Sequence, residues 1–128
     1  MSARTEPLKI LIADDHAGMR GVIRRSCAAL AAEFIECENG EDAVRAFTAA
    51  PQDWVIMDVQ MPRMDGFAAT AAILRFKPDA RVILISQFSE PEYAEHARQS
   101  GAICFIGKAD LSGVAEVIRR QSGHRPEI

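Results

Sequence analysis

Short apolar stretches alternate with longer amphipathic segments along most of this chain. The first stretch, LKILIA, is nearly continuous, as expected for a strand that is covered on both faces. Five such stretches predict strands at residues 8–13, 33–37, 54–57, 81–86 and 102–106. Apolar residues at helical spacing follow each of them and predict five helices. The first helical stripe consists of Met19, Val22, Ile23, Cys27 and Leu30.

Residues that cap helices support the positions of these helices. Asn39 and Asp65 are each predicted to cap the helix that follows them. Ser89 and Glu92 have the spacing of a capping box at the start of the fourth helix. Asp110 is predicted to cap the last helix.

The alternation of strands and helices predicts right-handed βαβ units, and therefore a parallel sheet with helices on both faces. The fold class is α/β: a doubly wound five-stranded parallel sheet, flavodoxin-like (βα)5, for which we expect the strand order 2-1-3-4-5. We expect one domain over residues 7–121, then a polar tail at 122–128 and no output domain. Ligand sites in such folds lie beyond the carboxyl ends of the strands, where the strand order reverses.

Polar residues gather at this predicted edge. The first strand is followed by Asp14 and Asp15, and the third ends at Asp58. The fourth strand ends at Ser86, and the fifth leads to Lys108. Three carboxylates this close repel one another, so they require cationic neighbours. The lysine provides one charge, and a hard divalent cation such as Mg²⁺, which prefers oxygen ligands, would provide two more.

Each of these residues alone has a structural explanation. An aspartate after a strand often caps the next helix, a serine there is common in turns, and a lysine is usually a solvated charge. The coincidence of five suitable residues at the strand ends favours a functional site. The histidines are weaker candidates. His16 is predicted to be a first-turn helix residue, and His96 and His124 are predicted to be exposed.

Composition and charge exclude several classes of function. The 128 residues carry a formal net charge of −3, so there is no basic surface for phosphate backbones, and direct nucleic-acid binding is not expected. No apolar run approaches the roughly 20 residues of a membrane span, and the first residues lack the apolar segment of a secretory signal. The three cysteines have no CxxC spacing and are predicted to be buried thiols in a reducing compartment. We therefore expect a cytoplasmic protein.

Four segments together carry a family resemblance: ILIADDH, VIMDVQMPRMDG, VILIS and GAICFIGK. Over residues 7–121 the chain resembles the receiver domain of bacterial response regulators, the CheY-like superfamily. The resemblance implies that Asp58 is the phosphoacceptor. It also implies that Asp15 and Asp58 bind Mg²⁺ with the backbone carbonyl of Gln60, and that Asp14 acts through a metal-bound water.

The same resemblance implies a phosphorylation-activated signalling switch rather than an enzyme. Asp58 would take a phosphoryl group from the phosphohistidine of a sensor histidine kinase or phosphotransfer protein, in a two-component system or phosphorelay. Lys108 would offset the developing charge. Ser86 would be the switch hydroxyl and Phe105 the switch aromatic, and the helix-strand-helix surface of residues 90–120 would carry the signal. A phosphorylation-dependent dimer is one assembly that the resemblance allows.

Two features leave alternatives open. Gln87 stands where the family usually has a small residue, and a long side chain there would screen the phosphoryl group, so an unphosphorylated scaffold stays an alternative. The segment GKADL resembles receivers with a helix-turn-helix output, so the downstream partner is either an unknown protein or a missing output domain.

The enzymatic alternative is a haloacid-dehalogenase-type phosphatase. That family has an aspartate two residues after its nucleophile, where this chain has Gln60.

Overall fold

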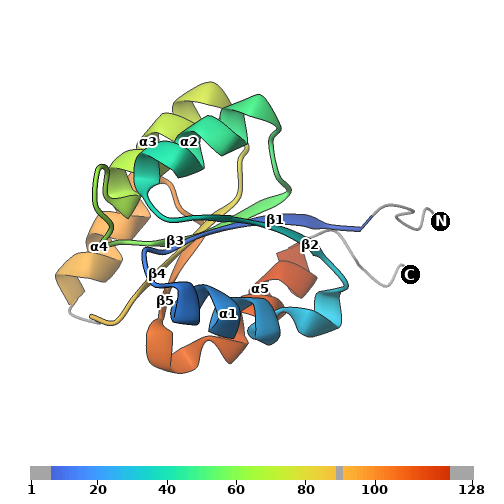
Figure 1. Ribbon diagram of the computed structural model, residues 1–128. Coiled ribbons are helices and arrows are strands. Elements are labelled where there is room, and N and C mark those ends of the chain that lie inside the picture. Colours follow the sequence, from blue (N-terminus) through green and yellow to red (C-terminus); the bar gives the residue numbers. More distant parts are fainter. Residues whose placement is uncertain (1–6, 89–90, 122–128) are drawn as a thin grey trace.

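The computed structural model describes residues 7–88 and 91–121, in which five parallel strands form one sheet between layers of helices (Figure 1). The strand order is β2-β1-β3-β4-β5, which confirms the predicted order. The strands are β1 Lys9–Ala13, β2 Glu33–Cys37, β3 Trp54–Asp58, β4 Val82–Ser86 and β5 Cys104–Gly107. The helices are α1 Ala17–Ser26, α2 Gly40–Ala49, α3 Gly66–Phe76, α4 Pro91–Ser100 and α5 Ser112–Gln121. Two 3₁₀ helices lie at Ala28–Leu30 and Lys108–Asp110.

The helices form two layers, with α2, α3 and α4 on one face of the sheet and α1 and α5 on the other (Figure 1). Each layer buries its own apolar core against the sheet. Phe47 and Ile73 lie in the core under α2 and α3, and Ile23 and Ile118 lie in the core under α1 and α5. Strands β3 and β4 are buried along their whole length because they are covered on both sides. Their carboxyl ends are therefore fixed in position by two cores.

Two of the predicted helix caps are confirmed. The side chain of Asn39 accepts a hydrogen bond from Asp42 N at 2.8 Å, and that of Asp65 accepts one from Ala68 N at 2.8 Å. These bonds satisfy backbone donors that have no partner within their helix. The predicted cap Ser89 lies outside the described residues, as does the predicted tail at 122–128.

The predicted cap of the last helix is wrong. Asp110 lies inside the 3₁₀ helix that follows β5, and α5 begins two residues later, at Ser112. Leu111 stands between the two helices and is buried in the core under α5. The chain turns through the 3₁₀ helix because this brings Leu111 into that core before α5 starts.

The first helix is shorter than the apolar stripe predicts. α1 ends at Ser26, and a 3₁₀ helix then leads to Ala31, whose φ of 53° lies in the left-handed region. Ile23 and Cys27 are fully buried, whereas Val22 is 36% exposed. The inward face of α1 follows the i, i+4 spacing through Ile23 and Cys27, so Val22 lies at its margin.

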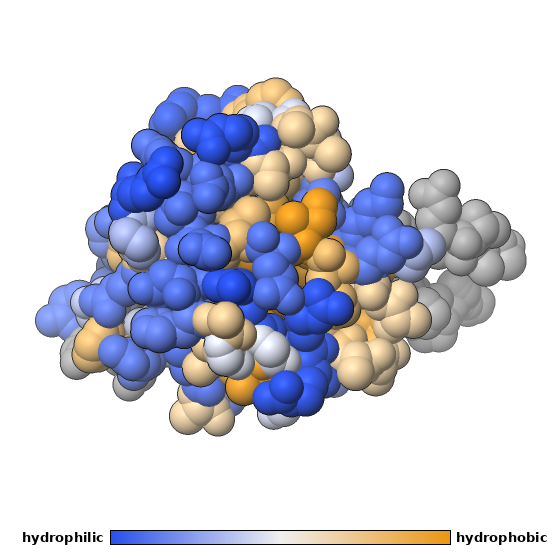
Figure 2. All heavy atoms as spheres, in the orientation of Figure 1, coloured by the Kyte–Doolittle hydropathy of each residue, from blue (hydrophilic) through white to orange (hydrophobic). Residues whose placement is uncertain are grey.

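The molecular surface is mostly hydrophilic on the face shown in Figure 2, with small apolar areas between polar side chains. None of the helices in the described ranges is long and apolar enough to cross a membrane. The thiols of Cys27 and Cys37 are buried and that of Cys104 is half-buried. Burial raises the pKa of Cys27 to about 11, which keeps this thiol protonated and unreactive.

Candidate functional site

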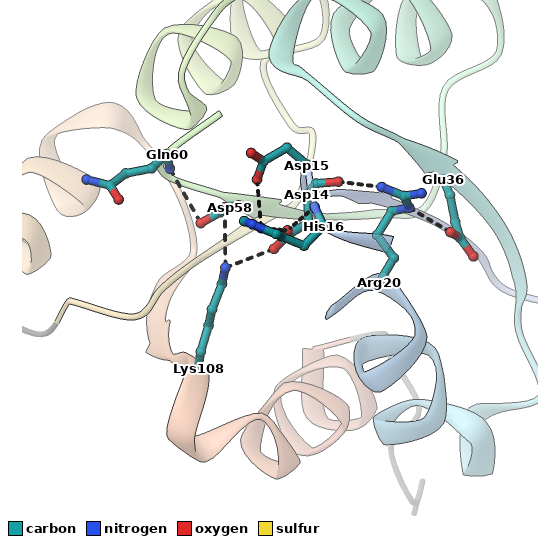
Figure 3. A network of polar contacts seen from close by, with 8 residues as sticks. All are labelled: Asp14, Asp15, His16, Arg20, Glu36, Asp58, Gln60 and Lys108. Atoms are coloured by element: carbon teal, nitrogen blue, oxygen red, sulfur yellow. Dashed lines mark hydrogen bonds and ion pairs between the residues drawn. The ribbon is translucent and has the colours of Figure 1, made fainter. Parts of the chain in front are cut away.

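Three strand ends bring predicted charged residues into contact (Figure 3). β1 leads directly into Asp14, β3 ends at Asp58, and Lys108 follows β5. Since β1 and β3 are paired neighbours, their two aspartates leave the sheet side by side. The ammonium of Lys108 lies 3.0 Å from Asp14 Oδ2 and 3.3 Å from Asp58 Oδ2. One lysine thus bridges two carboxylates.

These three charges are largely withdrawn from solvent. Asp14 is fully buried, Asp58 is 4% exposed, and the side chain of Lys108 is 14% exposed. One ammonium balances one carboxylate, so two buried carboxylates leave an excess of negative charge. The site therefore favours either a proton or an additional cation.

The ionisation of Asp58 reflects this environment. The pKa of Asp58 is raised to about 6, mainly by burial and also by the charge of Asp14, while Lys108 and the backbone N–H of Gln60 lower it without cancelling the rise. Burial also disfavours the charged form of Lys108, but contact with Asp14 and Asp58 outweighs this effect and raises its pKa. At neutral pH Asp58 is consequently ionised, and yet it is poorly stabilised by solvent.

The oxygen atoms at this site suit a hard cation. Asp14, Asp15 and His16 offer ligand atoms within 4.8 Å of one another, a grouping found among the described residues. Apart from the ion pair with Lys108, buried Asp14 Oδ2 has no hydrogen-bond partner within the described ranges. A pocket of about 450 Å³ opens onto Asp15, Asp58 and Lys108. Carboxylate oxygens facing a solvent-accessible pocket match the preference of Mg²⁺, which keeps several waters.

His16 belongs to the rim of this site. It occupies the position before the first turn of α1, and its backbone N–H donates to Asp14 Oδ1 at 2.9 Å. Its exposed imidazole places Nδ1 3.1 Å from Asp15 Oδ1. Mg²⁺ prefers oxygen over imidazole nitrogen, so His16 is a neighbour of the two carboxylates and not a ligand of choice.

The loop after Asp58 packs closely back on the strand. The backbone N–H of Gly66 donates to the carbonyl of Val59 at 2.8 Å. A Cβ at Gly66 would overlap the carbonyl oxygen of Asp58 and lie 2.9 Å from Val59 Cα, so the close approach requires glycine. Arg63 has a φ of 68°, and its guanidinium contacts Glu41 of α2 at 2.7 Å. The loop is therefore held at Arg63 and at Gly66.

The family model for the response regulator receiver domain matches residues 10–119. The chain belongs to this family. Receiver domains are phosphorylation-activated switches of two-component signalling and bind Mg²⁺ at an acidic pocket.

Individual relatives agree with this assignment. The chain is 37% identical over 102 residues to the chemotaxis protein CheY of Listeria monocytogenes, covering 79% of this chain and 86% of CheY. It is 31% identical over 116 residues to the response regulator GacA of Pseudomonas aeruginosa, covering 88% of this chain but 54% of GacA. The chain thus spans about half the length of GacA.

Solved structures show the same fold. A chain of the CheX-CheY-BeF3-Mg complex from Borrelia burgdorferi aligns with a TM-score of 0.80 at 28% identity, covering 89% of this chain and 88% of that one. The signal receiver domain of the putative response regulator NarL from Mycobacterium tuberculosis aligns with a TM-score of 0.83 at 27% identity, covering 94% of this chain and 99% of that one.

The predicted switch residues lie on β4 and β5, the two strands that follow β3 in the order of the sheet. Ser86 ends β4 and is buried, and its hydroxyl accepts a hydrogen bond from Phe88 N at 2.9 Å. Phe105 is half-buried on β5, against the core under α2 and α3. Gln87 is exposed and lines the same pocket as Asp58. Gln87 therefore lies at the pocket onto which Asp58 and Lys108 open.

Three hydrogen bonds at the site are not predicted by the sequence. Arg20 of α1 donates to the backbone carbonyl of Asp14 at 2.7 Å and to Glu36 Oε1 at 2.8 Å, which fixes the end of β1. The side-chain amide of Gln60 donates to the hydroxyl of Tyr93 on α4 at 3.4 Å. An arginine or a tyrosine on an amphipathic helix gives no local signal for such contacts, because they depend on tertiary packing.

Proposed function

We propose that Asp58 accepts a phosphoryl group from the phosphohistidine of a sensor histidine kinase or phosphotransfer protein. The observation that carries this proposal is the carboxylate of Asp58 at the pocket, 4% exposed and 3.3 Å from the ammonium of Lys108. A carboxylate of raised pKa that is still ionised at neutral pH is a competent nucleophile.

The chemistry is transfer of one phosphoryl group between two protein side chains. A carboxylate oxygen of Asp58 attacks phosphorus, a P–O bond forms, and the P–N bond to the donor imidazole breaks with its electron pair going to the imidazole. The product is an acyl phosphate on Asp58. Lys108 lies close enough to Asp58 to offset the negative charge that develops on the phosphoryl oxygens.

The acidic residues would hold the metal ion that this chemistry requires. Asp15, Asp58 and the backbone carbonyl of Gln60 are the proposed ligands, and Asp14 acts through a metal-bound water. When bound, Mg²⁺ supplies positive charge opposite the transferring phosphoryl oxygens and relieves the repulsion among the carboxylates. The open pocket and the unused acceptor capacity of Asp14 Oδ2 support this set.

Phosphorylation would be read out by the α4-β5-α5 surface. The hydroxyl of Ser86 donates to a phosphoryl oxygen, and Phe105 takes the space that the hydroxyl leaves. Such a response needs two states separated by a few kcal/mol, which the new contacts bias. The recipient is a separate downstream protein or a further domain, as the greater length of GacA suggests. A cytoplasmic location accords with this role.

Intact-mass measurement tests the proposal. The chain is incubated with Mg²⁺ and acetyl phosphate, and we expect one phosphoryl group per molecule. Asp58→Asn should abolish the product, as should chelation of the metal ion. The matched control is Asp79→Asn, which removes a carboxylate whose side chain is 81% exposed and paired with Lys77.

Other results would favour other functions. Steady hydrolysis of a generic phosphate ester, with no accumulation of phosphoprotein, would indicate a phosphatase. Absence of any phosphoprotein with either acetyl phosphate or a phosphohistidine donor would indicate an unphosphorylated scaffold and contradict the proposal.

A further inference from the structure

Four aromatic rings connect the loop after β4 with α3 and α4. Phe88 stacks on Tyr93 with ring centroids 5.9 Å apart, and Tyr93 stacks on Phe67 at 6.4 Å. Phe67 in turn stacks on His96 at 3.9 Å. All three pairs are close to parallel, with interplanar angles of 17°, 19° and 12° respectively. We call Phe88, Tyr93, Phe67 and His96 the aromatic ladder.

The aromatic ladder is a large part of what holds α4 in place. Ala97 is the buried residue of this helix, and its other side chains are half-buried or exposed. Tyr93 and His96 lie on one side of α4, three residues apart, and both stack on Phe67 of α3. The hydroxyl of Tyr93 also accepts a hydrogen bond from Gln60. A helix with so little buried apolar area depends on contacts of this kind.

One end of the aromatic ladder is tied to the switch hydroxyl. The backbone N–H of Phe88 donates to Ser86 Oγ at 2.9 Å, and Ser86 is 1% exposed. This bond fixes the orientation of the serine side chain and the position of Phe88 together. If the hydroxyl rotates toward a phosphoryl oxygen on Asp58, its oxygen moves away from this N–H. Phe88 then loses the bond that holds its ring against Tyr93.

We propose that the aromatic ladder carries the phosphorylation signal from Ser86 to α4, with Phe88 as the positioning residue. The inference rests on the function proposed above and adds a route through Phe88 and Tyr93 to the expected movement of Phe105. Release of Phe88 weakens its stacking on Tyr93, and α4 shifts because Tyr93 is one of its main attachments. Aromatic pairs of this type stabilise beyond the area that they bury, which is enough to bias a helix with two nearly equal positions.

Tyr93 is the one tyrosine of the chain, so 3-fluorotyrosine labels the aromatic ladder at a single position. Its ¹⁹F resonance is recorded before and after phosphorylation with Mg²⁺ and acetyl phosphate, and intact mass is measured on the same samples. We expect a clear shift on phosphorylation in the wild type. Phe88→Leu should still be phosphorylated but lose most of this phosphorylation-dependent shift. Phe76→Leu, which removes an exposed ring at the far end of α3, should keep the shift.

A second arm needs no phosphoryl group. Ser86→Ala removes the acceptor of the Phe88 N–H. The ¹⁹F resonance of Tyr93 in this unphosphorylated variant should therefore move toward its position in the phosphorylated wild type. An unmoved resonance in Ser86→Ala overturns the inference, as does a full phosphorylation-dependent shift in Phe88→Leu. Loss of the shift in Phe105→Leu but not in Phe88→Leu also overturns it and assigns the route to Phe105. Absence of phosphoprotein in the wild type contradicts the proposed function instead.

Discussion

At the scale of single residues, the three aspartates of the site differ in burial and in their charged neighbours. Asp14 and Asp58 are both buried and share Lys108, whereas Asp15 is exposed and has His16 beside it. The buried pair carries more negative charge than one lysine balances, and this excess is what a bound cation or a proton relieves.

Gln87 is the residue of the pocket at which we expect this chain to differ from the usual receiver pattern. It is exposed and lines the pocket with Asp58 and Lys108, so its side chain is placed to obstruct a phosphodonor or an attacking water. We expect Gln87→Ala to speed phosphorylation by acetyl phosphate and also loss of the phosphoryl group. Small displacements from in-line geometry can cost about a hundredfold in rate, so a severalfold effect is reasonable. Both rates are followed by intact mass.

Gln99→Ala on α4 is the matched control, since this amide is exposed and bonded to Glu95. It should leave both rates unchanged. Changes below about twofold in Gln87→Ala would make the glutamine neutral, because such changes correspond to less than about 0.5 kcal/mol. Slower phosphorylation in Gln87→Ala would show that the side chain assists transfer, against the steric account.

At the scale of helices and strands, the sequence predicts two helix caps and the edge of the sheet where the charged residues meet, but not the features that depend on tertiary packing. The caps Asn39 and Asp65 could be predicted because a cap bonds within three residues of itself. The approach of Asp14, Asp58 and Lys108 could be predicted as well, since parallel strands place their carboxyl ends at one edge. Asp110 has the chemistry of a cap, but the burial of its neighbour sets where α5 begins. The stacking in the aromatic ladder depends on how α4 packs on α3, which no local pattern encodes.

The contact between the start of α3 and the end of β3 predicts the effect of one methyl group. Gly66→Ala would drive a Cβ into the carbonyl of Asp58 and against Val59, so strand or helix must shift. We expect a loss of about 1–3 kcal/mol in the free energy of unfolding, measured by urea denaturation, together with slower phosphorylation because Asp58 is displaced. Gly18→Ala in α1 is the control, because a Cβ there meets nothing within 4 Å. It should be neutral or stabilising. Equal effects of the two variants would contradict a tight α3–β3 contact.

At the scale of the whole molecule, the site lies where the architecture leaves an opening. β1 and β3 lie side by side, and the helices that follow them, α1 and α3, lie on opposite faces of the sheet (Figure 1). The segments that follow β1 and β3 diverge there and leave the carboxyl ends of these strands accessible. The strands themselves are anchored in two cores. The same anchoring prevents the carboxylates from moving apart, so their repulsion is stored in the fold. The stability of the whole domain should therefore respond to the charge of the site.

The stability of the metal-free protein should depend on the ionisation of Asp58. Its pKa of about 6 in the folded state lies above the ordinary value of 3.8, so between these values the folded state binds the proton more tightly. The contribution of Asp58 to stability is then fully present below about pH 4 and is lost as the pH rises through about 6. A rise of about two units in this pKa corresponds to about 3 kcal/mol of stability.

In the presence of a chelator, Asp58→Asn should have the same free energy of unfolding as the wild type near pH 4 and a higher one at pH 7. Urea denaturation across this range measures the difference, with Asp79→Asn as the control because the pKa of Asp79 is lowered by Lys77. A variant that is less stable than the wild type at pH 7 would assign Asp58 a structural role and contradict the strained, ionised carboxylate.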